Sequence, residues 1–234
     1  MIPPMNFAFS EEQEELRKVV RDFLGAKSSE ATVRELMETD SGYDAAVWSQ
    51  MGEQMGLQGL IIPEEFGGSG YSYVELIVVL EEMGRRLLCA PYFATVALAA
   101  NTLLHSGDDA AKAEYLPGIA SGETIATLAF TEANGKWDES GITLEASGSG
   151  SDYTLTGEKM YVLDGTIANL ILVAAKTAGG VSLFAVQGDA SGLTREGLST
   201  MDQTRKQARL TFDATPAKLI GTEGGGWAVL SQVL

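Results

Sequence analysis

Residues 128–165 read LAFTEANGKWDESGITLEASGSGSDYTLTGEKMYVLDG, and this stretch decides the fold. Strand-forming residues occupy 142–147 and 153–156, on either side of Gly148-Ser149-Gly150-Ser151. Two such runs around a glycine-bearing turn predict a β-hairpin. The Gly/Ser run does not lead from a strand into a helix, so it does not qualify as a phosphate-binding loop.

Further strand runs follow the hairpin, at residues 169–175, 181–186 and 207–213. No helical segment alternates with them. A doubly wound parallel sheet is therefore excluded, and an antiparallel sandwich or barrel is predicted. Three consecutive glycines then precede Trp227-Ala228-Val229-Leu230, which indicates the beginning of another helix.

Before residue 121 the sequence has helical period. Ser10 with Gln13, and Ser72 with Glu75, are spaced as capping boxes that begin helices. Apolar residues follow each box at helical spacing: Leu16, Val19, Val20, Phe23 and Leu24 after the first, and Leu76, Val79, Leu80 and Met83 after the second. Gly25 is expected to end the first of these helices.

Two more helices are predicted in this half. One follows Asp44, carries Val47, Trp48, Met51 and Met55, and is expected to stop at Gly56. The other covers 94–104 and is nearly all apolar, which implies burial on most sides. The chain is thus predicted to be an α+β protein, with an all-α domain at 1–121, an antiparallel β-sandwich or barrel domain at 122–222, and the start of a truncated helical bundle at 223–234.

The charge balance narrows the possible partners. The formal net charge of the 234 residues is -16, and such a surface repels nucleic acid and anionic membranes. No apolar run reaches the ~18–20 residues of a membrane span, and no signal peptide is visible. The single cysteine, Cys89, excludes an internal disulfide, and one histidine disfavours a metal site. A cytoplasmic location is therefore expected.

The opening stretch resembles the flavin-binding segment of the acyl-CoA dehydrogenases. In that family a Thr-Glu-Pro-x-x-Gly-Ser-Asp run leads through a hairpin to Asn-Gly-x-Lys-x-Trp-Ile-Thr/Ser-Asn-Gly. The positions in register are Thr131, Glu132, Asp138, Gly141, Gly157, Lys159, Met160 and Gly165. The departures are equally clear: Lys136-Trp137 replace Gly-Ser, Tyr161 replaces Trp, and Leu163 replaces the hydroxyl residue.

Three other segments resemble the same family in the same order. They are GLQGLIIPEEFGGSGYSYVEL at 56–76, KAEYLPGIASGE at 112–123 and MDQTRKQARLTFDATPAKLIGTEGGGW at 201–227. Relative to the family pattern, the carboxy-terminal helical bundle is absent after residue 234. The expectation is a truncated member of the family.

The resemblance implies FAD as cofactor and an acyl-CoA thioester as substrate. It places Leu128, Phe130, Thr131, Tyr161 and Leu163 along the flavin. Lys136 and Trp137 are candidate substrate-binding residues. The catalytic base of relatives comes from the carboxy-terminal domain, so no residue here is assigned as catalytic.

Both substrate-binding candidates have alternatives. Lys136 either offers a cation to a coenzyme phosphate or is a solvated loop lysine. Trp137 either fills flavin or acyl space or packs on a partner subunit. Because a bulky pair replaces two small residues, the chain by itself is expected to hold FAD poorly.

Two functions remain open. The first is a FAD-dependent subunit that desaturates an acyl-CoA at the α and β carbons, with hydride transfer to flavin. The second is a structural, catalytically incomplete subunit of a heteromeric acyl-CoA dehydrogenase, since the altered loop looks similar to non-catalytic chains of actinobacterial steroid-degrading heteromers. In either case a homo- or hetero-oligomer with another acyl-CoA dehydrogenase subunit is expected.

Overall fold

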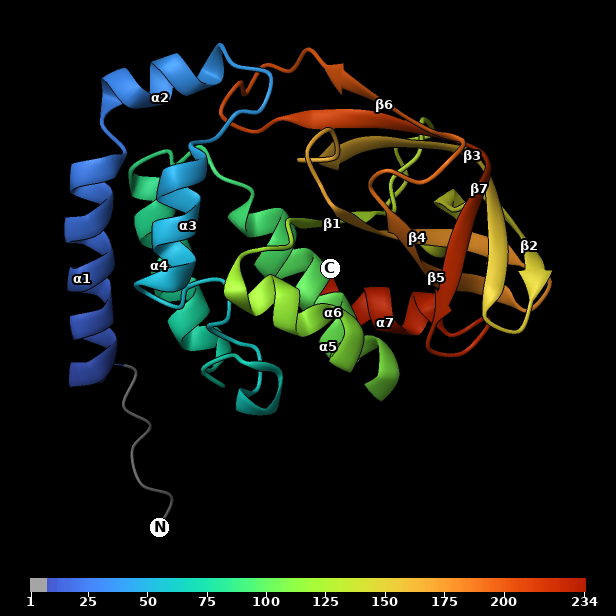
Figure 1. Ribbon diagram of the computed structural model, residues 1–234, viewed down its shortest axis with the longest axis horizontal. Coiled ribbons are helices and arrows are strands. Elements are labelled where there is room, and N and C mark those ends of the chain that lie inside the picture. Colours follow the sequence, from blue (N-terminus) through green and yellow to red (C-terminus); the bar gives the residue numbers. More distant parts are fainter. Residues whose placement is uncertain (1–7) are drawn as a thin grey trace.

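The computed structural model describes residues 8–234, so the expectation of no signal peptide falls partly outside the described residues. The helices are α1 (Glu11–Lys27), α2 (Glu30–Met37), α3 (Ala45–Glu53), α4 (Tyr73–Arg85), η2 (Phe93–Ala100), α5 (Asn101–His105), α6 (Asp109–Ser121) and α7 (Gly226–Val233), with short 3-10 turns η1 (Glu64–Phe66) and η3 (Glu139–Gly141). Helices α1 to α4 lie at one end of the molecule and the β domain at the other (Figure 1).

Both predicted capping boxes are present. The Ser10 and Ser72 side chains cap α1 and α4, and the side chains of Gln13 and Glu75 accept from the cap N–H groups in return. The prediction that Gly25 ends the first helix is wrong, because α1 continues to Lys27. Gly25 instead makes room for a neighbour: a Cβ there would lie 3.3 Å from Arg86 Nη2.

The predicted apolar helix at 94–104 is largely buried, but residues 94–100 of it are π-helical. The π segment η2 continues directly into α5. Thr95 Oγ1 donates to the Ala126 carbonyl at 3.0 Å and accepts from the Ala126 N–H at 3.2 Å. These bonds attach the helical domain to the first strand of the β domain.

The β domain contains β1 (Ala126–Ala129), β2 (Glu145–Ser149), β3 (Asp152–Leu163), β4 (Leu170–Thr177), β5 (Gly180–Gln187), β6 (Leu193–Leu198) and β7 (Gln207–Ile220). The order β1-β4-β2-β3-β7-β5, with β4 also pairing β5, closes the sheet into a barrel. The predicted fold class, a helical domain followed by a β domain, is confirmed. Pairing is antiparallel except that β1, and one residue pair of β2, run parallel to β4.

Several strands differ from the predictions: β3 extends to Leu163 and β7 to Ile220, beyond the predicted 153–156 and 207–213. The strand expected from residue 142 begins at Glu145, because the N–H groups of Thr143 and Leu144 donate to the Glu132 carboxylate instead of to a strand. Strand β6 was not predicted. It is mostly polar and lies off the closed path of strands, where its ladder with β7 defines it.

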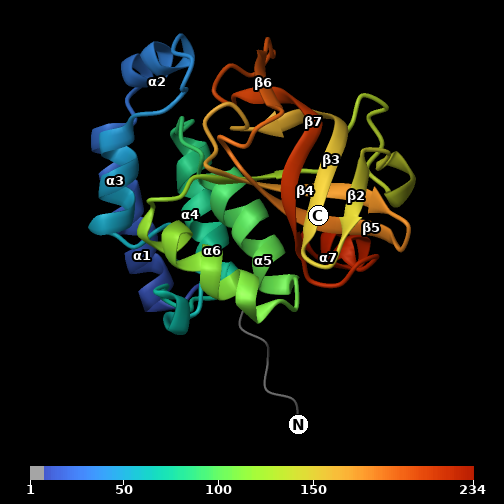
Figure 2. The ribbon, with the colours of Figure 1, turned by 45° about the vertical axis from the view of Figure 1, so that its right-hand side comes forward.

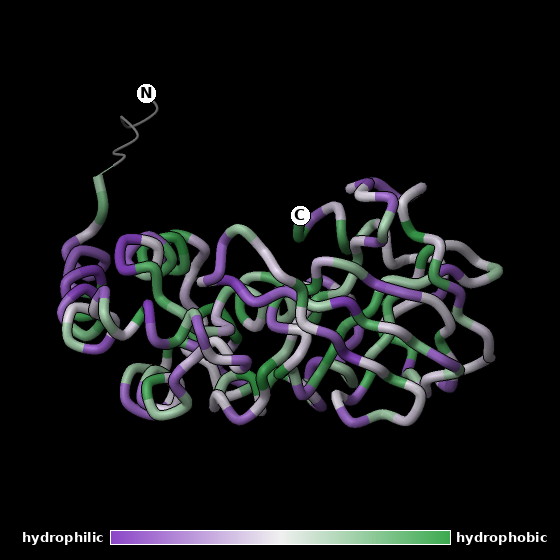
Figure 3. The backbone as a smooth tube through the Cα atoms, turned by 90° about the horizontal axis from the view of Figure 1, so that it is seen from above, coloured by the Kyte–Doolittle hydropathy of each residue, from purple (hydrophilic) through white to green (hydrophobic). Residues whose placement is uncertain are grey.

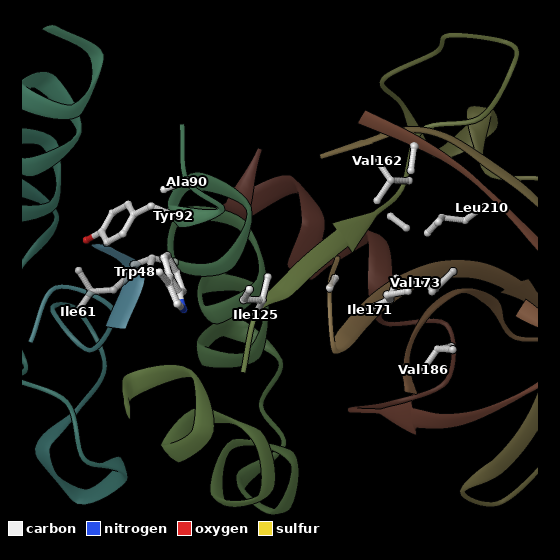
Figure 4. Packing of buried hydrophobic residues seen from close by; sticks show 14 of the residues in the cluster. Trp48, Ile61, Ala90, Tyr92, Ile125, Val162, Ile171, Val173, Val186 and Leu210 are labelled. Atoms are coloured by element: carbon white, nitrogen blue, oxygen red, sulfur yellow. The ribbon is translucent and has the colours of Figure 1, made fainter. Parts of the chain in front are cut away.

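The hydrophobic core runs through both domains without a break. Figure 4 shows Trp48, Ile61 and Tyr92 on the helical side, Val173 and other barrel residues on the far side, and Ile125 between them. The Trp48 indole N–H donates to the Gly122 carbonyl at 2.8 Å, which ties α3 to the domain junction. The two domains therefore form one packed body, seen lengthwise in Figure 3.

The carboxyl end of the chain lies at the junction of the two domains (Figures 1 and 3). Helix α7 packs on α5 and β5, beside the barrel (Figure 2). Within residues 8–234, no helix combines the length and the apolar character of a bilayer span. The same residues contain no group of three or more His, Cys, Asp or Glu side chains arranged to hold a metal.

Candidate functional site

A cavity of about 510 Å³ lies where the helical domain, the barrel and α7 meet. Its walls include six of the seven predicted site residues: Leu128, Phe130, Thr131, Trp137, Tyr161 and Leu163. The seventh, Lys136, is not in the lining. The structure therefore brings the predicted cofactor-binding residues together around one space.

Strand β1 and the chain directly after it form one wall of this cavity. Leu128 belongs to β1, and Phe130 and Thr131 follow its last residue. All three are buried. The Thr131 carbonyl accepts from the Met160 N–H at 2.9 Å, which holds this wall against β3.

Tyr161 reaches the cavity through an irregularity in β3. The register of β3 against β7 shifts between Lys159 and Val162. Tyr161 lies in this shift with φ +59°, a left-handed conformation that non-glycine residues rarely adopt. Its side chain is 50% exposed although its neighbour Val162 is buried. The bulge thus turns an aromatic ring out of the barrel wall toward the cavity.

Trp137 forms the rim of the cavity. Its side chain is 69% exposed, and its ring packs edge-on against Phe130 with centroids 5.2 Å apart. Next to it, Lys136 points away, with Nζ 3.3 Å from Ser140 Oγ. Asn134 shapes the loop, since its side chain donates to the Gly141 carbonyl at 2.8 Å and accepts from the Lys136 N–H at 2.9 Å.

A buried ion pair fixes the cavity wall from behind. Lys159 Nζ lies 2.7 Å from Glu132 Oε1 and donates to the Phe130 carbonyl at 3.2 Å. Lys159 is 0% exposed and Glu132 is 5% exposed. The Glu132 carboxylate also accepts from the N–H groups of Thr143 and Leu144 at 2.8 and 2.9 Å, and from the Thr143 hydroxyl.

Burial and pairing act in opposite directions on the two charges. Burial lowers the pKa of Lys159 to about 8, although Glu132 offsets part of this effect. Burial also tends to raise the pKa of Glu132, but the Lys159 ammonium and the bonds from Thr143 and Leu144 prevail, so the pKa lies below its ordinary value. The motif contained both residues, yet their spacing of 27 positions gave no sign of contact.

The far wall consists of residues that sequence reasoning missed. Phe93 and Leu98 come from η2, Gln207 begins β7, and Val233 and Leu234 end the chain. No motif connects these positions. Only the tertiary fold brings them opposite the wall formed by β1 and β3.

A second cavity of about 410 Å³ adjoins the first. The two share Phe93, Leu163 and Gln207. The remaining lining of the second cavity comes from α4, the following segment and the approach to β7: Leu80, Met83, Gly84, Leu88, Ala90, Tyr92, Asp202 and Arg205. The site is therefore a two-part space with mainly apolar walls.

A buried carboxyl follows Leu163, which lines both cavities. Asp164 is buried with φ +53°, in the turn after β3. Burial raises the pKa of Asp164 to about 7, while Arg205 lowers it to a smaller extent. Arg205 Nη1 donates to the Ala90 carbonyl at 3.1 Å, which links the start of β7 to the helical domain.

Comparison with known proteins gives a consistent picture. Residues 10–123 match the family described as "Acyl-CoA dehydrogenase, N-terminal domain", and residues 127–215 match "Acyl-CoA dehydrogenase, middle domain". The probable acyl-CoA dehydrogenase YngJ of Bacillus subtilis (strain 168) is 32% identical over 200 residues, which cover 81% of this chain and 51% of the relative. The chain thus spans about half the length of that curated relative.

Two similar solved structures are complexes of two named components. The Tcur3481-Tcur3483 steroid ACAD G363A variant has a TM-score of 0.84 and 29% identity, covering 95% of this chain and 60% of that one. The ChsE4-ChsE5 complex from Mycobacterium tuberculosis has a TM-score of 0.84 and 26% identity, covering 98% and 61%.

Proposed function

The chain belongs to the acyl-CoA dehydrogenase family, as its motifs predicted, and from this premise we propose that it is a subunit of a FAD-dependent enzyme that desaturates an acyl-CoA thioester between its α and β carbons. Members of this family are FAD-binding flavoproteins. The observation that carries the proposal is the cavity of about 510 Å³ on which six of the seven predicted site residues converge.

The lining of this cavity fits a flat aromatic ring system. Its lining is mainly apolar, and Tyr161 supplies an aromatic face for stacking, whereas Trp137 stands at the rim. We propose that Leu128, Phe130 and Thr131 run along one edge of the flavin, and that Tyr161 and Leu163 pack on it. When bound, the flavin supplies the acceptor for the β hydride. The chain's own contribution is to position the ring and exclude water from it.

Removal of the α proton needs a base within hydrogen-bond reach of the substrate. Among the described residues, no Asp, Glu or His side chain lines the larger cavity. We therefore assign no catalytic residue in 8–234 and propose that another part of the assembly supplies the base. The acyl-CoA substrate and an oligomer with another acyl-CoA dehydrogenase subunit belong to this proposal, and a cytoplasmic location stays a prediction.

A second candidate function is a structural subunit of a heteromer. It is favoured by Trp137, which occupies the cavity rim where the family pattern has a small residue. Similarity to two solved two-component complexes supports it further. In this reading the cavity is kept, but a partner subunit holds the working flavin.

The flavin content of the purified protein separates these functions. We expect the double change Lys136→Gly and Trp137→Ser to raise FAD affinity about tenfold, because relief of crowding by one bulky ring is worth on the order of 1–3 kcal/mol. Flavin absorbance per protein chain, measured after dialysis, reports the change. Tyr71→Ser, which removes an exposed aromatic residue outside this lining, is the control and should leave flavin content unchanged.

Two outcomes would redirect the assignment. If the double variant binds no more flavin and Trp137→Ala alone disrupts assembly with a partner chain, the loop is an interface. That result would support the structural-subunit function. Stoichiometric FAD in the unmodified chain would refute the idea that the loop obstructs the site.

A further inference from the structure

The smaller cavity differs from the larger one in having a charged end. Most of its lining is apolar, with Leu80 and Met83 from α4 and Tyr92 from the segment before η2. Asp202 and Arg205 are the charged residues of this lining. Neither lines the larger cavity, so both lie on the side away from it.

Arg205 retains unused hydrogen-bonding capacity. One of its five N–H donors is bonded to the Ala90 carbonyl at 3.1 Å. That bond fixes the guanidinium at the cavity edge. Within residues 8–234, no carboxylate oxygen lies within the 4.0 Å of an ion pair with Arg205. The guanidinium is thus anchored and forms no ion pair within this distance, although its charge acts on the nearby Asp164 carboxyl.

The neighbouring charges leave this capacity available. Asp202 Oδ1 accepts from the N–H and hydroxyl of Thr204 at 2.9 and 2.6 Å. Asp164 faces Arg205 from the turn after β3, and burial raises the pKa of Asp164 to about 7, so that its neutral form predominates below that pH. Lys206, the next residue, donates to the Met37 carbonyl at 2.6 Å. Lys206 is not in the lining, so Arg205 is the cation that the cavity presents.

The shared residues lie between the two cavities and show where one leads into the other. Gln207 lines both, whereas Arg205 lines only the smaller one. Two residues of extended chain span at most roughly 7 Å. A ligand that leaves the larger cavity past Phe93 and Leu163 would therefore enter the cavity whose lining includes Arg205.

We propose that the smaller cavity holds the distal part of the acyl group and that Arg205 binds a carboxylate carried there, so that the substrate class is an acyl-CoA thioester with a second, distal carboxylate. This inference rests on the proposed function. A guanidinium matches a carboxylate with two parallel N–H···O bonds, and a plain alkyl end offers it no acceptor. The apolar walls take the carbon skeleton between the two ends. Arg205 acts in substrate specificity and has no part in the bond-breaking steps.

The test uses the full-length protein with its partner subunit and bound FAD. Two series of CoA thioesters of equal carbon number are compared, one made from dicarboxylic acids and one from monocarboxylic acids. Dissociation constants come from calorimetry, and flavin bleaching gives kcat/KM. We expect at least a tenfold preference for the dicarboxylic series at the best-fitting length. Hydrogen bonds to a charged group lower the dissociation constant more than tenfold.

Variants at Arg205 decide whether this residue causes the preference. Arg205→Leu should abolish it and leave binding of the monocarboxylic series within about threefold, while Arg205→Lys should retain part of it. Arg209→Leu, in the strand that follows Arg205, is the matched control, because Arg209 pairs with Glu196 and lines neither cavity. Thermal melting of each variant checks that it is folded.

The outcomes separate this inference from the function on which it rests. Equal affinity for both series, or a preference that survives Arg205→Leu, overturns the inference while the proposed function stands. A preference in binding without flavin bleaching supports the inference and favours the structural subunit. If neither series binds, both are wrong.

Discussion

Glu132→Ala is expected to lower the free energy of unfolding by about 3–5 kcal/mol, because it leaves the buried Lys159 ammonium without its counter-charge. The same change removes the acceptor for the N–H groups of Thr143 and Leu144. Urea unfolding at neutral pH measures the effect. Loss of the anchor should also loosen the loop that carries Trp137.

A surface ion pair provides the matched control. Lys218 Nζ lies 2.5 Å from Glu114 Oε2, but both side chains are about half exposed. Glu114→Ala is therefore expected to cost at most about 1 kcal/mol. The loss of unfolding free energy for Lys159→Met should lie between those two values, since Glu132 keeps its backbone donors. Equal losses for Glu132→Ala and Glu114→Ala would contradict the view that burial makes the pair at Glu132 important.

Asp164→Asn is expected to stabilise the protein above neutral pH. The folded-state pKa of Asp164 is raised to about 7 from an ordinary 3.8. Between these two values the unfolded chain releases the proton and the folded chain keeps it, so stability falls as pH rises and the loss is complete above the folded pKa. The amide cannot ionise, and asparagine tolerates the left-handed backbone at this position.

The measurement is the difference in unfolding free energy between Asp164→Asn and the unmodified protein at two pH values. We expect on the order of 2–4 kcal/mol in favour of the variant near pH 8 and little difference near pH 4. Asp213→Asn, at an exposed position, should change stability by less than about 0.5 kcal/mol at either pH. A gain for Asp164→Asn that does not vary with pH would show that the turn conformation, rather than the buried charge, is responsible.

The sequence alone determined the features that depend on neighbours within a few positions. Capping boxes at Ser10 and Ser72, the hairpin turn near Gly150 and the helix after Gly226 all follow from local hydrogen bonding and backbone preference. The family motif extended this reach. Leu128, Phe130 and Leu163 were predicted as site residues because the family motif identifies positions that belong to one site. Their spacing in the sequence gives no sign that they lie close together.

Only the tertiary structure decided what depends on contacts between distant segments. Gly25 reads as a helix stop, but the Arg86 side chain that packs on it lies 61 positions away. Strand β6 exists through its ladder with β7, and Asp164 acquires its raised pKa only through burial. The second cavity joins α4, η2 and the start of β7. Turns and caps are stabilised by hydrogen bonds between residues that are close in the sequence, so a local pattern reveals them. Burial, desolvation and the shapes of the cavities arise only when the two domains pack together.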